Sequence, residues 1–197
     1  MTNSATGYSA IAFSGSLRAA SSNTGLVRLA QRIAPDELSI EVDAAQAAIQ
    51  ALPFYNEDLE AEPPASVVAW RQLVADADAV IIGMPEHNFS PSAVAKNAID
   101  WLTRPPGQHT LKGKVIAMMT SGGMGGGSRV QAPLALILGY LGNVIVEEPA
   151  VNVKMGQTRI AADGTTDDEI TDLVRQKLAN VVEALHAQRA PQPPTAD

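Results

Sequence analysis

The segment Ser14–Asn23 (SGSLRAASSN) follows an apolar run and leads into a helix-like segment, and its composition is typical of an anion-binding site. Backbone N–H groups at the start of a helix have no partner within the helix, so they attract phosphate oxygens. Arg18 adds a permanent positive charge. Further hydrogen bonds can come from the side chains of Ser16, Ser21, Ser22 and Asn23. The alternative interpretation is an ordinary turn in which Ser22 caps the helix.

Two common signatures of larger phosphate ligands are absent from this part of the sequence. No G-x-x-x-x-G-K-[ST] is present for a triphosphate, and no G-x-G-x-x-G follows the first apolar run for a dinucleotide. A monophosphate is therefore the ligand that Ser14–Asn23 fits best.

A second polar segment, Gly83–Trp101, begins where a short apolar run ends and returns into a helix near Ser92. A flat heterocycle could rest against the loop residues Pro85, Glu86, His87 and Asn88. His87 is a candidate for contact with a substrate ring or a nicotinamide, and the alternative is an exposed histidine without a role. Capping, ion pairing or a subunit contact are the open alternatives for Lys96, Asn97 and Asp100.

A third segment, Thr120–Gln131, is rich in glycine and follows another apolar run. Glycine permits positive φ angles and close approach of the backbone to a ligand, so backbone amides here could meet a polar ring. The candidate contacts are Ser121, Gly122 and Gly123. A flexible loop without a ligand is the alternative. Arg129 is open to three interpretations: a second phosphate, a neighbouring subunit, or solvent.

Short apolar runs alternate with helix-like segments, which indicates an α/β protein with a parallel sheet covered on both faces. The runs are Tyr8–Phe13, Leu38–Val42, Ala79–Ile82, Val115–Met119 and Val144–Val146. Proline, glycine and asparagine interrupt the stretch Val130–Val146, so we predict a buried helix followed by a strand rather than a membrane span. In such a doubly wound sheet, the loops after the first and third strands meet where the strand order reverses, and ligands bind there.

The last predicted helix begins at a capping box, Thr166–Glu169, and continues past Val181. Its apolar stripe is interrupted only by Lys177, which we expect to reach solvent along its aliphatic stem. Beyond this helix the chain is rich in proline and polar residues. We therefore predict one domain over residues 1–188 and a disordered tail over residues 189–197.

The composition excludes several classes of function. Asp and Glu number 21 against 14 Lys and Arg, a formal net charge of -7, so nucleic acid is not an expected partner. The absence of cysteine excludes disulfides, thiolate nucleophiles, iron–sulfur clusters and cysteine-based zinc sites, so redox chemistry would need a bound cofactor. The opening MTNSATGYSAIAF lacks the basic start and apolar region of a signal peptide, so we expect a cytoplasmic protein. We also expect no membrane association and no metal site.

Four segments, taken together and in this order, resemble the NADPH-dependent FMN reductase family, which includes chromate and quinone reductases and some azoreductases. They are G-S-L-R-x-x-S-x-N at Gly15–Asn23, P-E-H-N at Pro85–Asn88, K-N-A-I-D-W at Lys96–Trp101 and S-G-G-M-G-G-G-S-R at Ser121–Arg129. The resemblance implies a flavodoxin-like, three-layer fold with a five-stranded parallel sheet. It also implies non-covalent FMN, NADPH or NADH as co-substrate, and assembly as homodimers or homotetramers.

The resemblance further implies roles for individual residues. The FMN phosphate loop corresponds to Ser16, Arg18, Ser21 and Asn23, with Ser22 beside them. The two edges of the isoalloxazine ring correspond to Pro85, Glu86, His87 and Asn88, and to Ser121, Gly122 and Gly123. Two departures lie where a second substrate should approach: His87 replaces the usual tyrosine, and Pro91–Ala95 replaces the family's proline–glycine pair.

The function predicted from these features is hydride transfer from NAD(P)H through bound FMN to a quinone, azo, metal-oxyanion or flavin acceptor, without a catalytic side chain. Two alternatives belong to other classes of function. One is a flavodoxin-type electron carrier that does not oxidise free NAD(P)H. The other is a flavin-free interaction or sensor domain on the same scaffold.

Overall fold

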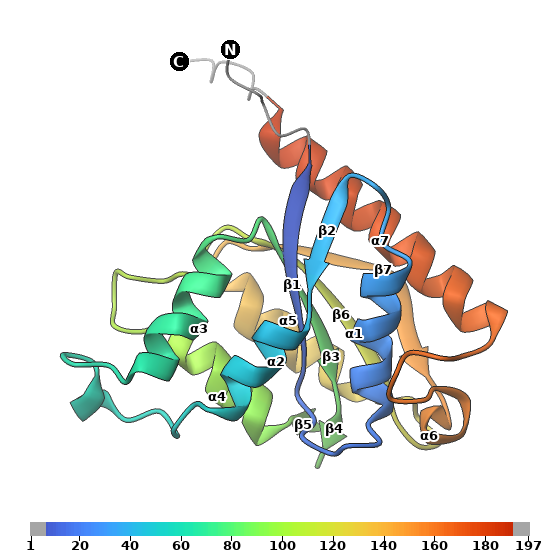
Figure 1. Ribbon diagram of the computed structural model, residues 1–197, viewed down its shortest axis with the longest axis horizontal. Helices are drawn as coiled ribbons and strands as arrows, with labels where there is room; N and C mark the ends of the chain where they lie inside the picture. The colour runs from blue at the N-terminus through green and yellow to red at the C-terminus, as the bar shows by residue number, and fades with distance from the viewer. Residues whose placement is uncertain (1–6, 191–197) are drawn as a thin grey trace.

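Five parallel strands form the central sheet of the computed structural model, which describes residues 7–190 (Figure 1). In sheet order they are β2 (Leu38–Glu41), β1 (Tyr8–Ser14), β3 (Ala79–Met84), β6 (Val115–Ser121) and β7 (Val144–Val153). The strand order reverses between β1 and β3, as in flavodoxin-type doubly wound sheets. The predicted fold class and the five predicted strands are confirmed.

Helices cover both faces of the sheet and make a three-layer structure (Figure 1). Successive side chains of a strand point to opposite faces, so Ala12 packs toward one helical layer and Phe13 toward the other. One layer contains α1 (Ser22–Arg32) and α7 (Asp168–Arg189). The other contains α2 (Asp43–Gln50), α3 (Ala65–Ala75), α4 (Ala93–Leu102) and α5 (Gln131–Gly139), with the short helix η1 (Glu57–Leu59) before α3. The predicted tail began at residue 189, but α7 includes Arg189, and residues 191–197 lie outside the described residues.

β7 is longer than the predicted run Val144–Val146, because it continues to Val153 beyond a bulge in its pairing with β6. Val146 pairs with Ala117, and pairing resumes where Val151 lies opposite Met119. The intervening residues are acidic and include a proline, so their sequence is typical of a loop rather than a strand. The apolar pattern alone therefore predicted only the first part of this strand.

Lys177 of α7 fills the space beside this bulge, and the prediction of a surface lysine is wrong. Its side chain is 1% exposed, and Nζ donates hydrogen bonds to the carbonyl oxygens of Val146 at 2.9 Å and Glu147 at 2.6 Å. These carbonyl groups lie where the pairing of β7 with β6 is interrupted, and the buried Lys177 supplies them with a donor. Burial lowers the pKa of Lys177 to about 8, although the charges of Glu148 and Glu147 oppose this shift.

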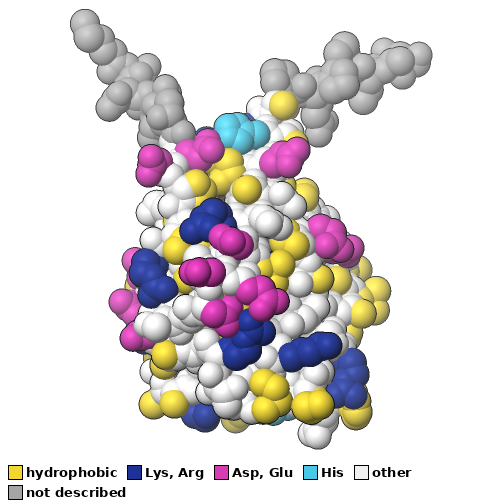
Figure 2. Space-filling model, turned by 90° about the vertical axis from the view of Figure 1, so that its right-hand side faces the viewer, with side chains coloured by type: hydrophobic (Ala, Val, Ile, Leu, Met, Phe, Trp, Pro, Cys, Tyr) yellow, Lys and Arg dark blue, Asp and Glu magenta, His cyan; other side chains and the backbone are white. Residues whose placement is uncertain are grey.

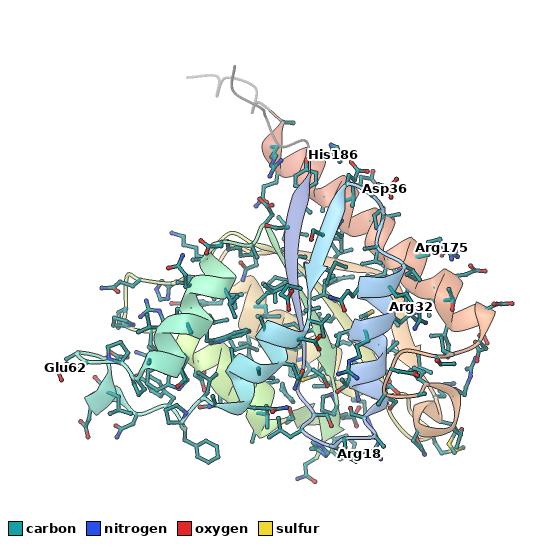
Figure 3. The ribbon with its side chains drawn as sticks, viewed as in Figure 1. Arg18, Arg32, Asp36, Glu62, Arg175 and His186 are labelled. Atoms are coloured by element: carbon teal, nitrogen blue, oxygen red, sulfur yellow. The ribbon has the colours of Figure 1, made fainter. Side chains whose placement is uncertain are left out.

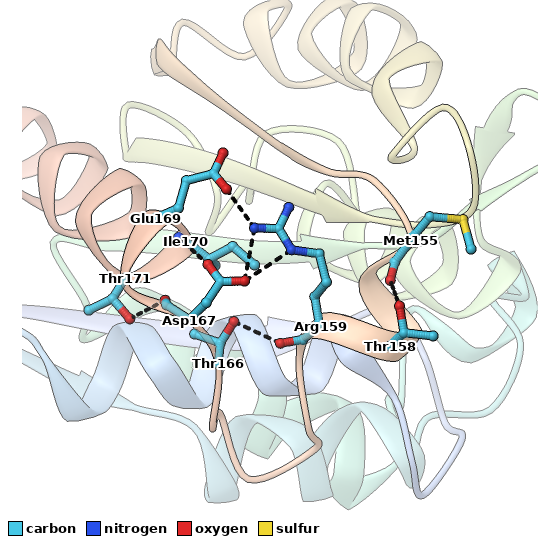
Figure 4. A network of polar contacts seen from close by, with 8 residues as sticks. All are labelled: Met155, Thr158, Arg159, Thr166, Asp167, Glu169, Ile170 and Thr171. Carbon is cyan, nitrogen blue, oxygen red and sulfur yellow. Dashed lines mark hydrogen bonds and ion pairs between the residues drawn. The ribbon is translucent and has the colours of Figure 1, made fainter.

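The N-cap of α7 is Asp167 rather than Thr166, and the third helical residue is Ile170, so the predicted capping box is not formed. The Asp167 side chain accepts a hydrogen bond from the backbone N–H of Ile170 at 3.0 Å. Thr166 instead donates its hydroxyl to the carbonyl oxygen of Arg159 at 2.9 Å. Arg159 also pairs with Asp167 at 2.8 Å and with Glu169 at 2.7 Å, as Figure 4 shows. This network ties the segment after β7 to the start of the last helix.

α5 is only half buried, although the sequence predicted a buried helix within Val130–Val146. Leu134 and Leu138 lie in the core, whereas Leu136 is 79% exposed and Tyr140, directly after the helix, is 87% exposed. An outer-layer helix has one face turned away from the sheet, so apolar residues all round it leave an apolar surface. Within residues 7–190, no helix has the length and apolar character needed to span a membrane.

Candidate functional site

A cavity of about 670 Å³ opens at the carboxyl ends of β1, β3 and β6, where the strand order reverses. Its volume is in the range of small-molecule sites. Figure 3 shows Arg18, one of its lining residues, at the end of the molecule opposite His186. The lining consists of Gly15, Ser16, Leu17, Arg18, Ser21, Ser22, Asn23, Pro85, Glu86, His87, Ser92, Ala93, Val94, Ser121, Gly122, Gly123 and Gln157.

The structure brings together all the predicted site residues except Asn88, which lies outside the cavity lining. Sequence reasoning missed Gly15, Leu17, Ser92, Ala93, Val94 and Gln157. Most of these are neighbours of predicted residues in the same loops. Gln157 belongs to α6 (Gly156–Arg159), in the segment after the last strand. Because the carboxyl ends of parallel strands share one edge of the sheet, that segment was a detectable candidate.

The loop after β1 is joined directly to the start of α4. The backbone N–H of Gly15 donates to Gly83 O at 2.9 Å, and the Ser92 hydroxyl donates to Gly15 O at 2.7 Å. The same hydroxyl accepts from Ala95 N at 3.3 Å and caps α4. A Cβ on Gly15 would lie 2.6 Å from Ser92 Oγ, so this contact requires glycine. The first two predicted segments therefore form one continuous wall of the cavity.

Asn23 and Ser22 connect α1 to the end of β6. Asn23 accepts from Ser121 N at 3.0 Å through Oδ1 and donates to Ser121 O at 2.9 Å through Nδ2. The Ser121 hydroxyl donates to Ser22 Oγ at 2.8 Å. The cap of α1 is Ser21, which accepts from Thr24 N at 3.2 Å, and not Ser22. These polar side chains thus hold the cavity walls together as well as lining the cavity.

Arg18 supplies the positive charge of this wall. It forms no ion pair within residues 7–190. Ser16 shapes the turn by accepting from Arg18 N at 3.4 Å. The N–H groups of a first helical turn have no acceptor within the helix, and Ser22 and Asn23 of that turn both line the cavity. A guanidinium and a helix N-terminus therefore meet at one end of the cavity, which suits an anion.

The second segment also forms a short hairpin, with strands β4 (Glu86–His87) and β5 (Ser90–Pro91), and its first strand lines the cavity. Its two turn residues, Asn88 and Phe89, have φ angles of 51° and 62°. Two-residue hairpin turns of this kind require positive φ at both positions. The turn carries Asn88 to the tip of the hairpin, beyond the cavity, while His87 is exposed and lines the cavity.

Glu86 anchors the hairpin to the glycine-rich loop. Its carboxylate pairs with Arg129 in the short helix η2 (Ser128–Val130), at 2.9 Å from Nε. The other carboxylate oxygen accepts from Arg129 N at 3.0 Å. The sequence left Arg129 open between phosphate, subunit and solvent, and the structure adds this ion pair.

The glycine-rich loop after β6 makes a compact turn that needs its glycines. Gly126 and Gly127 have φ angles of 64° and 78°, which larger residues rarely adopt. Gly122 accepts from Gly156 N at 3.0 Å, and a Cβ on Gly156 would lie 1.7 Å from Ser121 Oγ. The close approach at Gly156 brings Gln157 to the cavity.

The three polar residues of α4 that the sequence left open make contacts inside the chain. Lys96 pairs with Asp100 at 2.6 Å. Asn97 accepts from Tyr55 N at 2.7 Å and donates to Pro53 O at 2.9 Å. The structural alternative is therefore correct for Asn97, and Lys96 and Asp100 form an exposed helical ion pair.

Two other classes of ligand, metal ions and nucleic acid, depend on how the charged side chains are distributed. Within residues 7–190, no group of three or more His, Cys, Asp or Glu side chains could hold a metal ion. Figure 2 shows acidic and basic side chains intermixed on the face that carries α7, so that face has no uniform positive field.

The strand order and the anion-suited cavity at the point of reversal define a flavodoxin-like α/β protein. The model of the family "NADPH-dependent FMN reductase" matches residues 9–158. The chain therefore belongs to the NADPH-dependent FMN reductase family.

Individual relatives agree with this membership. The chain is 37% identical over 172 residues to an NAD(P)H-dependent FMN reductase of Pseudomonas aeruginosa, covering 85% of this chain and 90% of that protein. It is 37% identical over 159 residues to a 2-hydroxy-1,4-benzoquinone reductase of a Burkholderia species, covering 80% and 84%. Among solved structures, the flavoenzyme NAD(P)H:(acceptor) oxidoreductase FerB of Paracoccus denitrificans superposes with a TM-score of 0.81 at 33% identity, covering 92% of this chain and 98% of that one.

Proposed function

We propose that this chain is an FMN-dependent oxidoreductase that transfers reducing equivalents from NAD(P)H to a small-molecule acceptor, with quinones as the first acceptor to test. The observation that carries the proposal is the cavity at the switch point, with an anion-suited end at Arg18 and a glycine-rich wall at Gly122 and Gly123. Family membership and relatives named FMN and quinone reductases support it.

The residues present fit FMN. The cavity has a cationic end and a first helical turn for the phosphate, at Arg18, Ser16 and Ser21. Its other walls offer surfaces for a flat ring at Pro85 and His87 and at the glycine-rich loop. When bound, FMN would accept a hydride from the nicotinamide and pass the reducing equivalents on to the acceptor.

The side chains of this protein would bind and orient the reactants rather than take part in bond changes. The backbone N–H of Gly122 donates to Val153 O, whereas that of Gly123 can stabilise negative charge on a ring edge, as oriented amides do elsewhere. Asn23 fixes that wall through its two hydrogen bonds to Ser121, so it acts as a positioning residue. His87 is exposed at the cavity mouth, where it can contact the second substrate.

The test is a comparison of flavin binding with turnover. FMN is titrated into the purified protein and followed by visible absorption and flavin fluorescence, and NADPH oxidation is then measured with and without a simple quinone. Saturable FMN binding with quinone-dependent NADPH oxidation supports the proposal. FMN binding without NADPH oxidation favours an electron carrier, and the absence of FMN binding favours a flavin-free domain.

We further propose that copies of this chain associate through the exposed apolar face of α5. Leu136 and Tyr140 are more than three-quarters exposed, and Val144, at the start of the edge strand, is 41% exposed. Several large apolar side chains exposed within one short stretch of chain are typical of an association surface. Light scattering should give a dimer or tetramer mass that falls toward the monomer for Leu136→Lys. A cytoplasmic location is the accompanying proposal, and cell fractionation tests it.

A further inference from the structure

Arg129 and Phe89 lie beside the cavity without lining it, and Glu86 of the cavity lining joins Arg129 to the site. The Arg129 guanidinium lies over the Phe89 ring, with Cζ 4.1 Å from the ring centroid. Glu86 accepts from Arg129 Nε at 2.9 Å and from Arg129 N at 3.0 Å, and so fixes the guanidinium. The Glu86 side chain is 11% exposed and that of Arg129 is 60% exposed. The cluster of these three residues therefore presents an oriented cation at the surface.

The terminal edge of this guanidinium remains available for a ligand. Arg129 Nε and the backbone N–H of Arg129 donate to the Glu86 carboxylate, and Arg129 Cζ lies over the Phe89 ring. In the part of the chain that the structure describes, Nη1 and Nη2 of Arg129 have no hydrogen-bond acceptor. Two parallel N–H donors on a planar cation match a phosphate monoester in bidentate geometry.

Phe89 is exposed at a backbone conformation that bulky residues avoid. Its side chain is 61% exposed and its φ angle is 62°. The two-residue hairpin turn requires this φ angle, and the turn holds the aromatic ring at the surface. An exposed aromatic face beside a cation is suited to stack on a nucleic acid base.

The cluster lies at the rim of the cavity. Glu86 itself lines the cavity, and the position of a Cβ on Gly125 lies 3.9 Å from Arg129 Nη2. Gly125 belongs to the same loop as the lining residues Gly122 and Gly123. A ligand that extends from the cavity across this rim therefore meets Arg129 and Phe89.

We propose that Arg129 and Phe89 form the subsite for the 2′-phosphoadenosine end of NADPH. Arg129 binds the 2′-phosphate, and Phe89 stacks on the adenine. This inference rests on the proposed function, because the nicotinamide end must reach the flavin in the cavity. It gives the chain a preference for NADPH over NADH. The other available monoester is the FMN phosphate, which we assign to the Arg18 end, so the test must separate the two sources.

The first test is steady-state kinetics of Arg129→Gln with both nucleotides. The KM for NADPH should rise about tenfold or more, as for a lost charge-assisted hydrogen bond, while the KM for NADH and the affinity for FMN stay unchanged. Arg104→Gln is the matched control, because Arg104 also lies over an aromatic ring, 5.8 Å from the Tyr55 centroid, and does not line the cavity. Equal changes for both nucleotides, no change, or weaker FMN binding would overturn the subsite.

The second test measures equilibrium binding and does not depend on turnover. Calorimetry of the FMN-loaded protein should give tighter binding of adenosine 2′,5′-bisphosphate than of adenosine 5′-monophosphate, and Arg129→Gln should remove the difference. Phe89→Leu should weaken both ligands. Equal affinity of the wild-type protein for the two probes refutes the subsite, whatever the rate of NADPH oxidation. Selective binding without NADPH oxidation supports the subsite and refutes only the proposed function.

Discussion

Replacing the buried Lys177 by methionine should change how the stability of the protein depends on pH. Lys177 is 1% exposed, and burial lowers its pKa from 10.5 to about 8. Lys177→Met keeps an unbranched apolar chain but removes the ionisable group and its hydrogen bonds to Val146 and Glu147. The lost hydrogen bonds lower stability at every pH, so the pH dependence is what reports the ionisation.

The sign and size follow from the two pKa values. Between pH 8 and pH 10.5 the unfolded chain keeps the Lys177 proton while the folded protein loses it. The unfolded state then binds more protons, so the free energy of unfolding rises with pH over this window. One pKa unit corresponds to about 1.4 kcal/mol, so the full shift contributes about 3 kcal/mol. The variant lacks this contribution. Across this pH window, the free energy of unfolding of wild type should therefore rise by about 3 kcal/mol relative to that of Lys177→Met.

Urea denaturation of both proteins from below pH 8 to above pH 10.5 measures this difference. Other groups titrate in both proteins, so they cancel when the two free energies of unfolding are subtracted. Lys112→Met is the control for the loss of one exposed lysine charge. A flat difference for Lys177→Met would refute the reasoning, because Lys177 would then ionise alike in the folded and unfolded states.

Arg18→Ala should weaken FMN binding by about 1.5–3 kcal/mol, as for a charged hydrogen bond, and an unchanged Kd in a flavin fluorescence titration would remove Arg18 from the phosphate site. Gly25→Ala should lower the free energy of unfolding by about 1–3 kcal/mol, because the new Cβ would lie 2.1 Å from Ala161 O. Urea denaturation measures this loss, and a variant as stable as wild type would contradict the close packing. Asp167→Ala should cost about 1 kcal/mol by leaving Ile170 N without its cap. Thermal denaturation should then rank Asp167→Asn between this variant and wild type.

The sequence by itself was enough to predict the sheet, its helical layers and the segments that form the cavity. Strands covered on both faces appear as short apolar runs, and the loops after them contain the polar and glycine residues that a ligand site needs. The segments Gly15–Asn23, Pro85–Asn88 and Ser121–Arg129 were found in this way, and their order also carried the family resemblance. These features are local, so no knowledge of the folded structure was required.

The tertiary structure decided what each polar side chain contacts. Asn23 and Ser121 are 98 positions apart, yet two hydrogen bonds join them and make Asn23 part of the frame of the cavity. Lys177 appeared as a surface residue because its own helix offers no reason to bury it, and the reason is a bulge in a strand 30 or so positions away. Periodicity and composition report which face of an element is apolar. They do not report which distant groups a side chain will meet. Distant backbone groups placed Asn23 and Lys177, and the Glu86 carboxylate placed Arg129.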